Sequence, residues 1–246
     1  MSDLTGRVAL VTGGSRGIGA ATALRLARDG ADVAITYASS PDKAQAVVQS
    51  VQALGRRAIA IHADSADADA MVAAVERTVA ELGLLDILVS NAGVFSYKPF
   101  EEVSREEYTA MMAINVQAPF VAAQAASRHL PDGGRIVTIG SCLGERVGGP
   151  NMALYSASKA AVIGLAKGLA QDLGPRGITS NVVQPGPIDT DMNPADGEGA
   201  EVQRAGLPLR RYGRSEDIAA MVAHLAGPAG DFITGAVISV DGGFSA

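Results

Sequence analysis

Short apolar runs alternate with longer amphipathic segments along the whole chain, and this alternation constrains the fold more than any other feature. The runs are apolar at consecutive positions, which is typical of parallel strands covered on both faces. Strands are predicted at Arg7–Thr12, Asp32–Tyr37, Arg57–His62, Asp86–Ser90, Arg135–Gly140, Thr179–Gln184 and Ala236–Val240. Helical segments fall between them, near 17–29, 41–54, 67–82, 104–130, 152–173 and 215–226. The pattern predicts an α/β fold, a doubly wound sheet of about seven parallel strands with helices on both faces, in a single domain over 1–246.

Local signals support two of the helix starts and set one segment apart. Ser40 before Pro41 predicts an N-cap with proline at the first helical position, and Ser104 with Glu107 predicts a capping box. Residues 185–214 are instead rich in glycine, proline and aspartate and carry little periodicity. A loop of that length in a compact domain usually has a function, so we expect a substrate-side loop or lid there.

A glycine-rich loop joins the first predicted strand to the first helix, with the sequence Thr12-Gly13-Gly14-Ser15-Arg16-Gly17-Ile18-Gly19. Glycines let the backbone turn tightly and let a pyrophosphate approach the amides of the helix N-terminus. The spacing is not G-x-G-x-x-G, so the prediction depends on the position of the loop at the start of a βαβ unit. That position predicts a Rossmann-type dinucleotide site. The expected contacts in the loop are Gly13, Ser15, Arg16, Gly17, Ile18 and Gly19.

The same residues fit a second motif. Residues 13–17 also match G-x-S-x-G, the nucleophile elbow of α/β-hydrolases, which needs a histidine base on a loop later in the chain. The chain has only His62, His129 and His224, and the last falls in a predicted helix. The hydrolase alternative therefore lacks a suitable base.

The end of the second predicted strand bears on the choice of cofactor. NAD-preferring sites place Asp or Glu there to bind the ribose 2′-hydroxyl. Here Tyr37 takes that position and Ser39 follows, while Arg16 can reach the same region and pair with a phosphate. The pattern favours NADPH/NADP+ over NAD.

Tyr155 and Lys159 stand four residues apart at the start of a predicted helix, so their side chains share one face. A nearby ammonium favours the phenolate and is expected to lower the pKa of the tyrosine. Such a tyrosine can give a proton to a carbonyl oxygen as a general acid. A pair at this spacing is by itself usually an ordinary solvated pair, but Ser141 ends the fifth predicted strand, at the sheet edge where these folds bind ligands.

Together these motifs make the chain resemble the short-chain dehydrogenase/reductase family over essentially its whole length. The matching segments are Thr12-Gly13-x-x-x-Gly17-x-Gly19, Asp64, Asn91-Ala92-Gly93, Asn115, Ser141, Tyr155-x-x-x-Lys159 and Pro185-Gly186. The resemblance implies an NADPH-dependent oxidoreductase that reduces a ketone or other carbonyl to an alcohol, similar to the 3-oxoacyl-carrier-protein reductase group. It also implies a small-molecule substrate and a homotetramer.

The resemblance further implies a role for each matching residue. Tyr155 would be the general acid, Lys159 would bind the nicotinamide ribose, Ser141 would hold the substrate oxygen, and Asn115 would anchor a proton-relay water. Asp64 would meet the adenine. The remaining implied cofactor contacts are Asn91, Ala92 and Gly93 beside the fourth strand, and Pro185, Gly186, Ile188 and Thr190, of which the last two would hold the carboxamide.

Two features near the expected substrate site depart from the family pattern. Glu145 and Arg146 are charged, and we expect a solvated surface pair. Cys142 flanks Ser141 and is expected to be a small apolar residue without chemistry.

A regulatory function is the alternative. Residues Gln184–Ala195 are similar to the same stretch of bacterial relatives that bind cyclic-di-GMP, and one fold can carry unrelated functions. The intact set of Asn115, Ser141, Tyr155 and Lys159 favours an enzyme, because a pure binder has no need of a phenol–ammonium pair.

Charge and cysteine content argue against other classes of protein. With 20 basic and 26 acidic residues, the net charge of −6 gives no basic footprint for nucleic acid. No apolar run approaches the roughly 18 residues of a membrane span. A single cysteine excludes an internal disulfide and a multi-cysteine metal site. A cytoplasmic protein without a metal or a membrane partner is expected.

Overall fold

The computed structural model describes residues 3–246 of the chain. Its centre is one sheet of parallel strands in the order β3-β2-β1-β4-β5-β6-β7. The strands are β1 (Val8–Val11), β2 (Asp32–Tyr37), β3 (Ala58–His62), β4 (Ile87–Ser90), β5 (Arg135–Ile139), β6 (Thr179–Pro185) and β7 (Val237–Val240). Every predicted strand is present, with ends within one residue of those expected. The doubly wound parallel sheet is confirmed.

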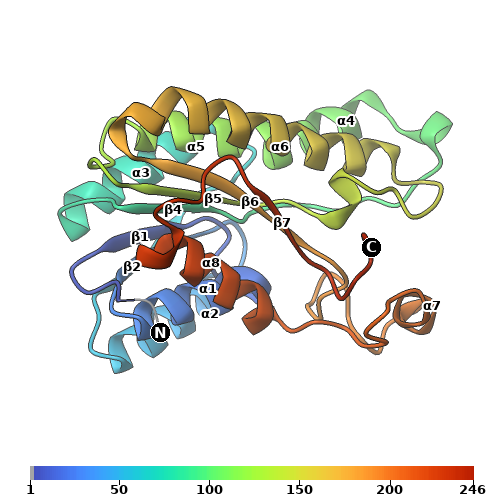
Figure 1. The fold of residues 1–246 in the computed structure, drawn as a ribbon, viewed down its shortest axis with the longest axis horizontal. Coiled ribbons are helices and arrows are strands. Elements are labelled where there is room, and N and C mark those ends of the chain that lie inside the picture. The colour runs from blue at the N-terminus through green and yellow to red at the C-terminus, as the bar shows by residue number, and fades with distance from the viewer. Residues whose placement is uncertain (1–2) are drawn as a thin grey trace.

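Helices cover both faces of the sheet, as predicted (Figure 1). One face carries α1 (Gly17–Arg28), α2 (Pro41–Ala53) and α8 (Ser215–Ala226), and the other carries α3 (Ala68–Leu82), α5 (Ala118–Ala126) and α6 (Ala153–Leu173). Short 3-10 turns are found at Phe100–Glu102, Cys142–Gly144, Gly174–Arg176 and Pro228–Gly230.

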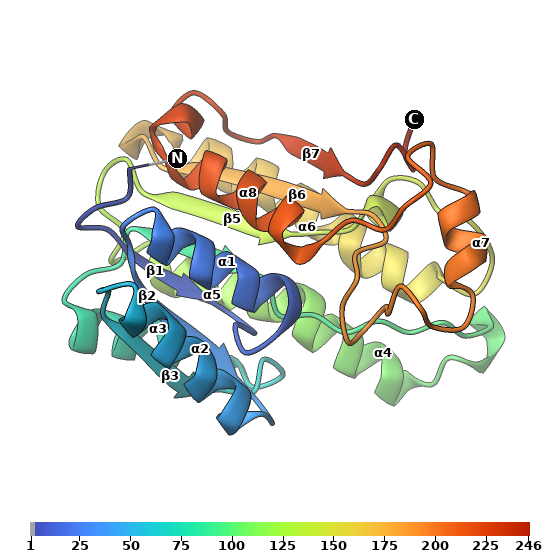
Figure 2. The same ribbon diagram turned by 90° about the horizontal axis from the view of Figure 1, so that it is seen from below.

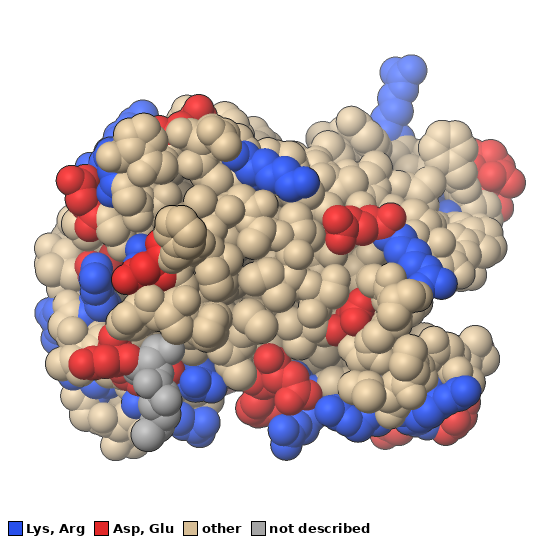
Figure 3. All heavy atoms as spheres, in the orientation of Figure 1, with Lys and Arg blue, Asp and Glu red and all other residues tan. Residues whose placement is uncertain are grey.

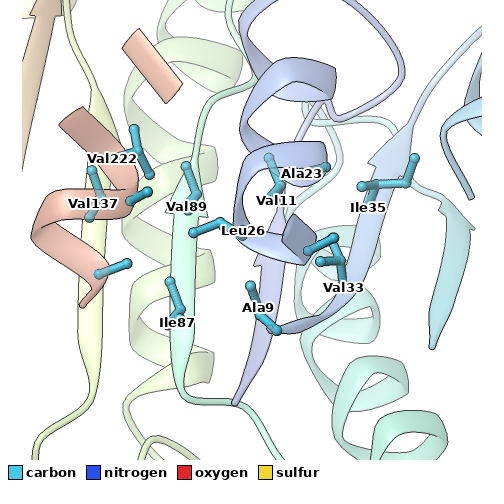
Figure 4. Packing of buried hydrophobic residues seen from close by; sticks show 14 of the residues in the cluster. Ala9, Val11, Ala23, Leu26, Val33, Ile35, Ile87, Val89, Val137 and Val222 are labelled. Carbon is cyan, nitrogen blue, oxygen red and sulfur yellow. The ribbon is translucent and has the colours of Figure 1, made fainter. Parts of the chain in front are cut away.

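The apolar runs form strands because each side chain enters one of two cores. In β1, Ala9 and Val11 pack into the core under α1 and α8, whereas Val8 and Leu10 pack into the core under α3 and α5. Figure 4 shows the first of these cores, where Leu26 of α1 lies over the strands. Burying a side chain of this size stabilises the fold by about 1.5–3 kcal/mol.

Both predicted helix starts are confirmed, with Ser104 and Ser40 as the N-cap residues. Ser104 accepts a hydrogen bond from the Glu107 amide and its own amide donates to the Glu107 carboxylate, which is the predicted capping box. Pro41 occupies the start of α2 as predicted, but the Ser40 side chain makes no capping bond. The Ser40 hydroxyl is therefore not committed to the helix.

The predicted helix at 104–130 is continuous from Arg105 to Ala126 but is not a regular α-helix throughout. The structure has α4 (Arg105–Met112), a π-helical segment at Ala113–Gln117 and then α5. The π segment holds the buried Asn115, and wide turns of this kind are frequent at functional sites.

The substrate-side loop, residues 185–214, is more ordered than its composition predicts. It contains a short helix, α7 (Ala200–Ala205), and isolated bridges join Ile188 to Gly213 and Thr190 to Asn193. It lies beyond the carboxyl ends of the strands (Figure 2). The strand order reverses between β1 and β4 at the same edge, and such folds place ligands there.

Residues 3–246 contain neither a candidate membrane span nor a candidate metal cluster. Within that range no helix is long and apolar enough to cross a membrane. The same residues contain no group of three or more His, Cys, Asp or Glu side chains arranged to hold a metal ion.

Candidate active site

The glycine-rich loop after β1 leaves room for an anion at the start of α1. Gly13 and Gly17 have positive φ angles of 64° and 52°, which favour glycine. A Cβ on Gly19 would lie 2.3 Å from the Gly13 carbonyl oxygen, so no larger residue fits. Arg16 precedes α1 without a side-chain capping bond, and the first turn holds no acidic residue. The free amides and the positive helix end suit a pyrophosphate.

Side chains from neighbouring strands hold this loop in place. Asn91, just after β4, donates from Nδ2 to the carbonyls of Thr12 (2.9 Å) and Gly13 (3.1 Å). Thr12 Oγ1 in turn accepts from the amides of Asn91 (3.0 Å) and Ala92 (3.1 Å). Thr36 Oγ1 of β2 accepts from the Gly13 amide at 3.0 Å, a contact that the sequence pattern did not single out. Asn91, the residue that follows β4, therefore holds the glycine loop in place.

The residues expected near the adenosine end lie together at the ends of β2 and β3. Tyr37 is half-buried and packs edge-on against His62 with ring centroids 5.5 Å apart. Ser39 and Asp64 are exposed, and Asp64 accepts a bond from the Ala66 amide at 2.9 Å. No carboxylate stands at the Tyr37 position.

The start of the substrate-side loop lies against the glycine loop. Pro185 is the last residue of β6, and a Cβ on Gly186 would lie 2.6 Å from Asp241 Cα, so this turn also requires glycine. Ile188 is buried and Thr190 is half-buried. A Cβ on Gly17 would lie 3.4 Å from Thr190 Cγ2, which places the loop beside the start of α1.

Ser141, Tyr155 and Lys159 come together beyond the carboxyl end of β5. The Lys159 ammonium lies 5.8 Å from the centroid of the Tyr155 ring, as expected for residues on one helix face, and Nζ donates to the Ile139 carbonyl at 3.1 Å. Ser141 hydrogen-bonds the Tyr155 side chain. The pair is therefore not a solvated surface pair.

Asn115 joins this group through Ser158. Its Nδ2 donates to Ser158 Oγ (3.0 Å), and Ser158 Oγ donates to the Tyr155 carbonyl at 2.7 Å. Asn115 Oδ1 accepts a hydrogen bond from the Val94 amide at 2.9 Å. A Cβ on Gly93 would lie 3.3 Å from Lys159 Nζ and 3.4 Å from Asn115 Oδ1, so glycine keeps a polar gap between them.

The electrostatics of the pair differ from the sequence expectation. Burial raises the pKa of Tyr155 to about 12, and the hydrogen bond from Ser141 opposes that rise only in part. Burial lowers the pKa of Lys159 to about 8. The lowering of the tyrosine pKa that the sequence predicts is not seen in this structure, because the loss of solvation outweighs the hydrogen bond from Ser141. Tyr155 is consequently protonated at neutral pH.

The charged residues Glu145 and Arg146 and the neighbouring Cys142, which depart from the family pattern, have different surroundings in the structure. Arg146 and Glu145 are exposed, but Arg146 donates to the carbonyls of Phe244 (2.6 Å) and Ala246 (2.8 Å) rather than forming a simple pair with its neighbour. Arg146 thus holds the last residues of the chain over the segment that follows Ser141. Burial raises the pKa of the Cys142 thiol to about 12, in keeping with an inert apolar role.

The structure adds Phe95, which the sequence pattern did not single out. Its ring packs edge-on against the Tyr155 ring with centroids 4.9 Å apart, and 43% of the residue is exposed. Figure 3 shows a notch between the part of the molecule that carries α4 and the part that carries α7, and the atoms around its mouth are mostly uncharged. Phe95 belongs to none of the sequence motifs, so its place beside Tyr155 could not be predicted from the spacing of residues.

Comparison with known proteins decides the family. A model of a family described as enoyl-(acyl carrier protein) reductase matches residues 13–245. The chain belongs to the short-chain dehydrogenase/reductase family. The resemblance inferred from the motifs is confirmed.

Three relatives illustrate the range of this family. A blue fluorescent protein from a metagenomic library, crystallised in complex with NADPH, is 58% identical with a TM-score of 0.98; the match covers 99% of this chain and 100% of that one. The cyclic-di-GMP-binding biofilm dispersal mediator protein of Escherichia coli is 46% identical over 246 residues, which is 100% of both chains. A probable tetrahydroxynaphthalene reductase of Zymoseptoria tritici is 41% identical over 98% of this chain and 95% of its own.

Proposed function

We propose that this chain is an NADPH-dependent oxidoreductase that reduces a ketone or another carbonyl compound to an alcohol, with Tyr155 as the general acid. The observation that carries the proposal is the meeting of Ser141, Tyr155 and Lys159 beside the glycine loop. A buried lysine is costly, and a protein that only bound a nucleotide would have no use for the phenol beside it.

The residues around the glycine loop fit NADPH. The amides at the start of α1 and the surfaces of Gly13, Gly17 and Gly19 would hold the pyrophosphate. Arg16, Tyr37 and Ser39 would bind the 2′-phosphate. The other proposed contacts are Ser15, Ile18, Asp64 at the adenine, and Asn91, Ala92, Gly93, Pro185, Gly186, Ile188 and Thr190 toward the nicotinamide.

The side chains of the site would handle the proton. When bound, NADPH supplies a hydride to the carbonyl carbon. Tyr155, protonated at neutral pH, donates its proton to the carbonyl oxygen, to which the Ser141 hydroxyl also donates a hydrogen bond. The Lys159 ammonium stabilises the phenolate that remains. Asn115 would anchor a water in the gap beside Gly93, through which the phenolate regains a proton.

The substrate-side loop would close over the reactants. We propose that residues 185–214 act as a lid and belong to the same domain as the sheet. They begin at the edge of the sheet where the cofactor would bind, and they place α7 beside the notch seen in Figure 3. Phe95, which is partly exposed beside Tyr155, suits an apolar carbonyl compound.

The test pairs a binding measurement with turnover. Tyr155→Phe keeps the ring and removes the proton donor, so ketone reduction should fall at least about 100-fold while NADPH still binds by fluorescence titration. Lys159→Ala should weaken both, because it also loses the ribose contact. A Tyr155→Phe variant that reduces ketones within about threefold of wild type would refute the mechanism.

Cofactor choice can be measured in the same assay. Arg16 and the absence of a carboxylate at Tyr37 should make kcat/KM about tenfold to a hundredfold higher with NADPH than with NADH. Tyr37→Asp should move the preference toward NADH. Equal values for the wild type would contradict the assignment.

A cyclic-di-GMP-binding regulator is the second candidate, and the whole-length similarity to the Escherichia coli dispersal mediator favours it. Isothermal calorimetry with cyclic-di-GMP distinguishes the two. Tight binding of cyclic-di-GMP with no ketone turnover would replace the enzymatic proposal.

A further inference from the structure

Three charged side chains from three separate parts of the chain meet beside the glycine loop. Asp191 belongs to the substrate-side loop, Arg16 to the glycine loop and Lys43 to the first turn of α2. One oxygen of Asp191, Oδ2, lies 2.8 Å from Lys43 Nζ and 3.7 Å from Arg16 Nη1. The Lys43 bond and charge, with a smaller contribution from Arg16, hold the pKa of Asp191 below its usual range. The carboxylate is therefore ionised at neutral pH.

The position of this group is fixed by the contacts around it. Thr190, the residue before Asp191, lies against Gly17 at the start of α1, so the carboxylate stays near the glycine loop. Arg16 is the cation that the proposed function assigns to the 2′-phosphate of NADPH. The Arg16 guanidinium would therefore interact with both the Asp191 carboxylate and the 2′-phosphate of the cofactor.

We propose that Asp191 is a specificity-determining residue that limits how strongly the chain prefers NADP(H) to NAD(H), because its carboxylate shares Arg16 and Lys43 with the 2′-phosphate. This inference rests on the proposed NADPH site. Two cations and one anion leave a net charge of +1 for a phosphate of about −1.5 to −2. NADH has a hydroxyl there and gains little from the cations.

The expected effect is modest because water screens the group. The side chains of Arg16, Lys43 and Asp191 are all more than half exposed. Exposed charges a few ångströms apart interact by about 1 kcal/mol or less in water, and salt weakens them further. Neutralising Asp191 should therefore change the affinity for NADPH by about threefold to fivefold.

A purely structural role for Asp191 gives a different result. If the ion pairs served only to keep the substrate-side loop closed, losing them would weaken NADPH and NADH by the same factor. The ratio of the two affinities, rather than either affinity alone, therefore separates the roles.

The experiment measures dissociation constants for NADPH and NADH by fluorescence titration on the full chain. Asp191→Asn should tighten NADPH binding about threefold to fivefold and change NADH binding less than twofold. Lys43→Met should shift the ratio in the opposite direction. Asp189→Asn is the matched control, since Asp189 is an exposed carboxylate on the same loop whose Oδ1 accepts from the Ala195 amide; it should leave the ratio unchanged.

Several outcomes would overturn the inference. An Asp191→Asn variant in which both cofactors change equally, or neither changes, removes the selectivity role. A ratio shift as large in Asp189→Asn would also remove it, and so would an Asp191→Asn effect that did not shrink at high salt. A wild-type protein that bound no NADPH would instead refute the proposed function on which the inference rests.

Discussion

Replacing Lys159 with methionine should make the folded protein more stable while it removes the activity. The Lys159 side chain is buried, and its Nζ donates to the Ile139 carbonyl. Burial lowers its pKa from 10.5 to about 8. That difference corresponds to about 3 kcal/mol by which the buried charge opposes folding at pH 7, at about 1.4 kcal/mol per pKa unit.

Methionine fills a similar volume without a charge, so most of the free-energy cost of burying the ammonium should disappear. The Ile139 carbonyl would lose its partner, which costs about 1–2 kcal/mol. The net gain should be about 1–2 kcal/mol, or a rise in Tm of roughly 2–8 °C for a chain of this size.

The gain in stability on replacing Lys159 with methionine should depend on pH. Because the folded pKa lies below the unfolded one, the opposition is fully present below about pH 8 and fades as the pH rises toward 10.5. The advantage of Lys159→Met over wild type should therefore be large at pH 7 and small at pH 10.

Thermal melts followed by circular dichroism at pH 7 and pH 10, without added cofactor, measure this directly. Lys167→Met is the matched control, because Lys167 lies on the same helix and is exposed. Its Tm should stay within about 2 °C of wild type. A Lys159→Met variant that melts lower than wild type at pH 7, or whose gain is as large at pH 10, would refute the reasoning.

Three further outcomes are expected. Gly19→Ala should abolish NADPH binding in a fluorescence titration, since its Cβ would lie 2.3 Å from the Gly13 carbonyl oxygen, and binding within threefold of wild type would contradict the cradle. Cys142 in the folded protein should resist iodoacetamide at pH 8, because burial raises its pKa to about 12; rapid labelling seen by mass spectrometry would count against that burial. The protein should be a homotetramer, because exposed Tyr108 and Phe120 on α4 and α5 leave apolar surface to cover, and light scattering that gave the chain mass of 25.0 kDa would exclude it.

The strands were predictable because burial on both faces leaves little choice of residue. A run such as Val8–Val11 must be apolar at every position, and its ends follow from where the apolar residues stop. The spacing of Tyr155 and Lys159 likewise fixes a shared helix face. Local patterns therefore predicted the sheet and the shared helix face of Tyr155 and Lys159.

The rest depends on contacts between distant segments, which spacing does not record. The π segment around Asn115 forms where its amide meets Ser158 and Val94, far away in the sequence. The rise in the pKa of Tyr155 comes from burial, which only the assembled fold supplies. Asp191 contacts Lys43, which is 148 residues away in the sequence, and no motif predicts this contact.

The brace between Thr12 and Asn91 also affects how the protein is made. Asn91 follows Thr12 by 79 residues, and β4 covers the free edge of β1 only when that part of the chain has been synthesised. At roughly 5–20 residues per second, the newly made β1 edge waits several seconds on the ribosome without its second neighbour. An apolar strand with an open edge is a template for pairing with other chains. Production of this protein should consequently depend on chaperones that shield nascent strands until the first half of the sheet has closed.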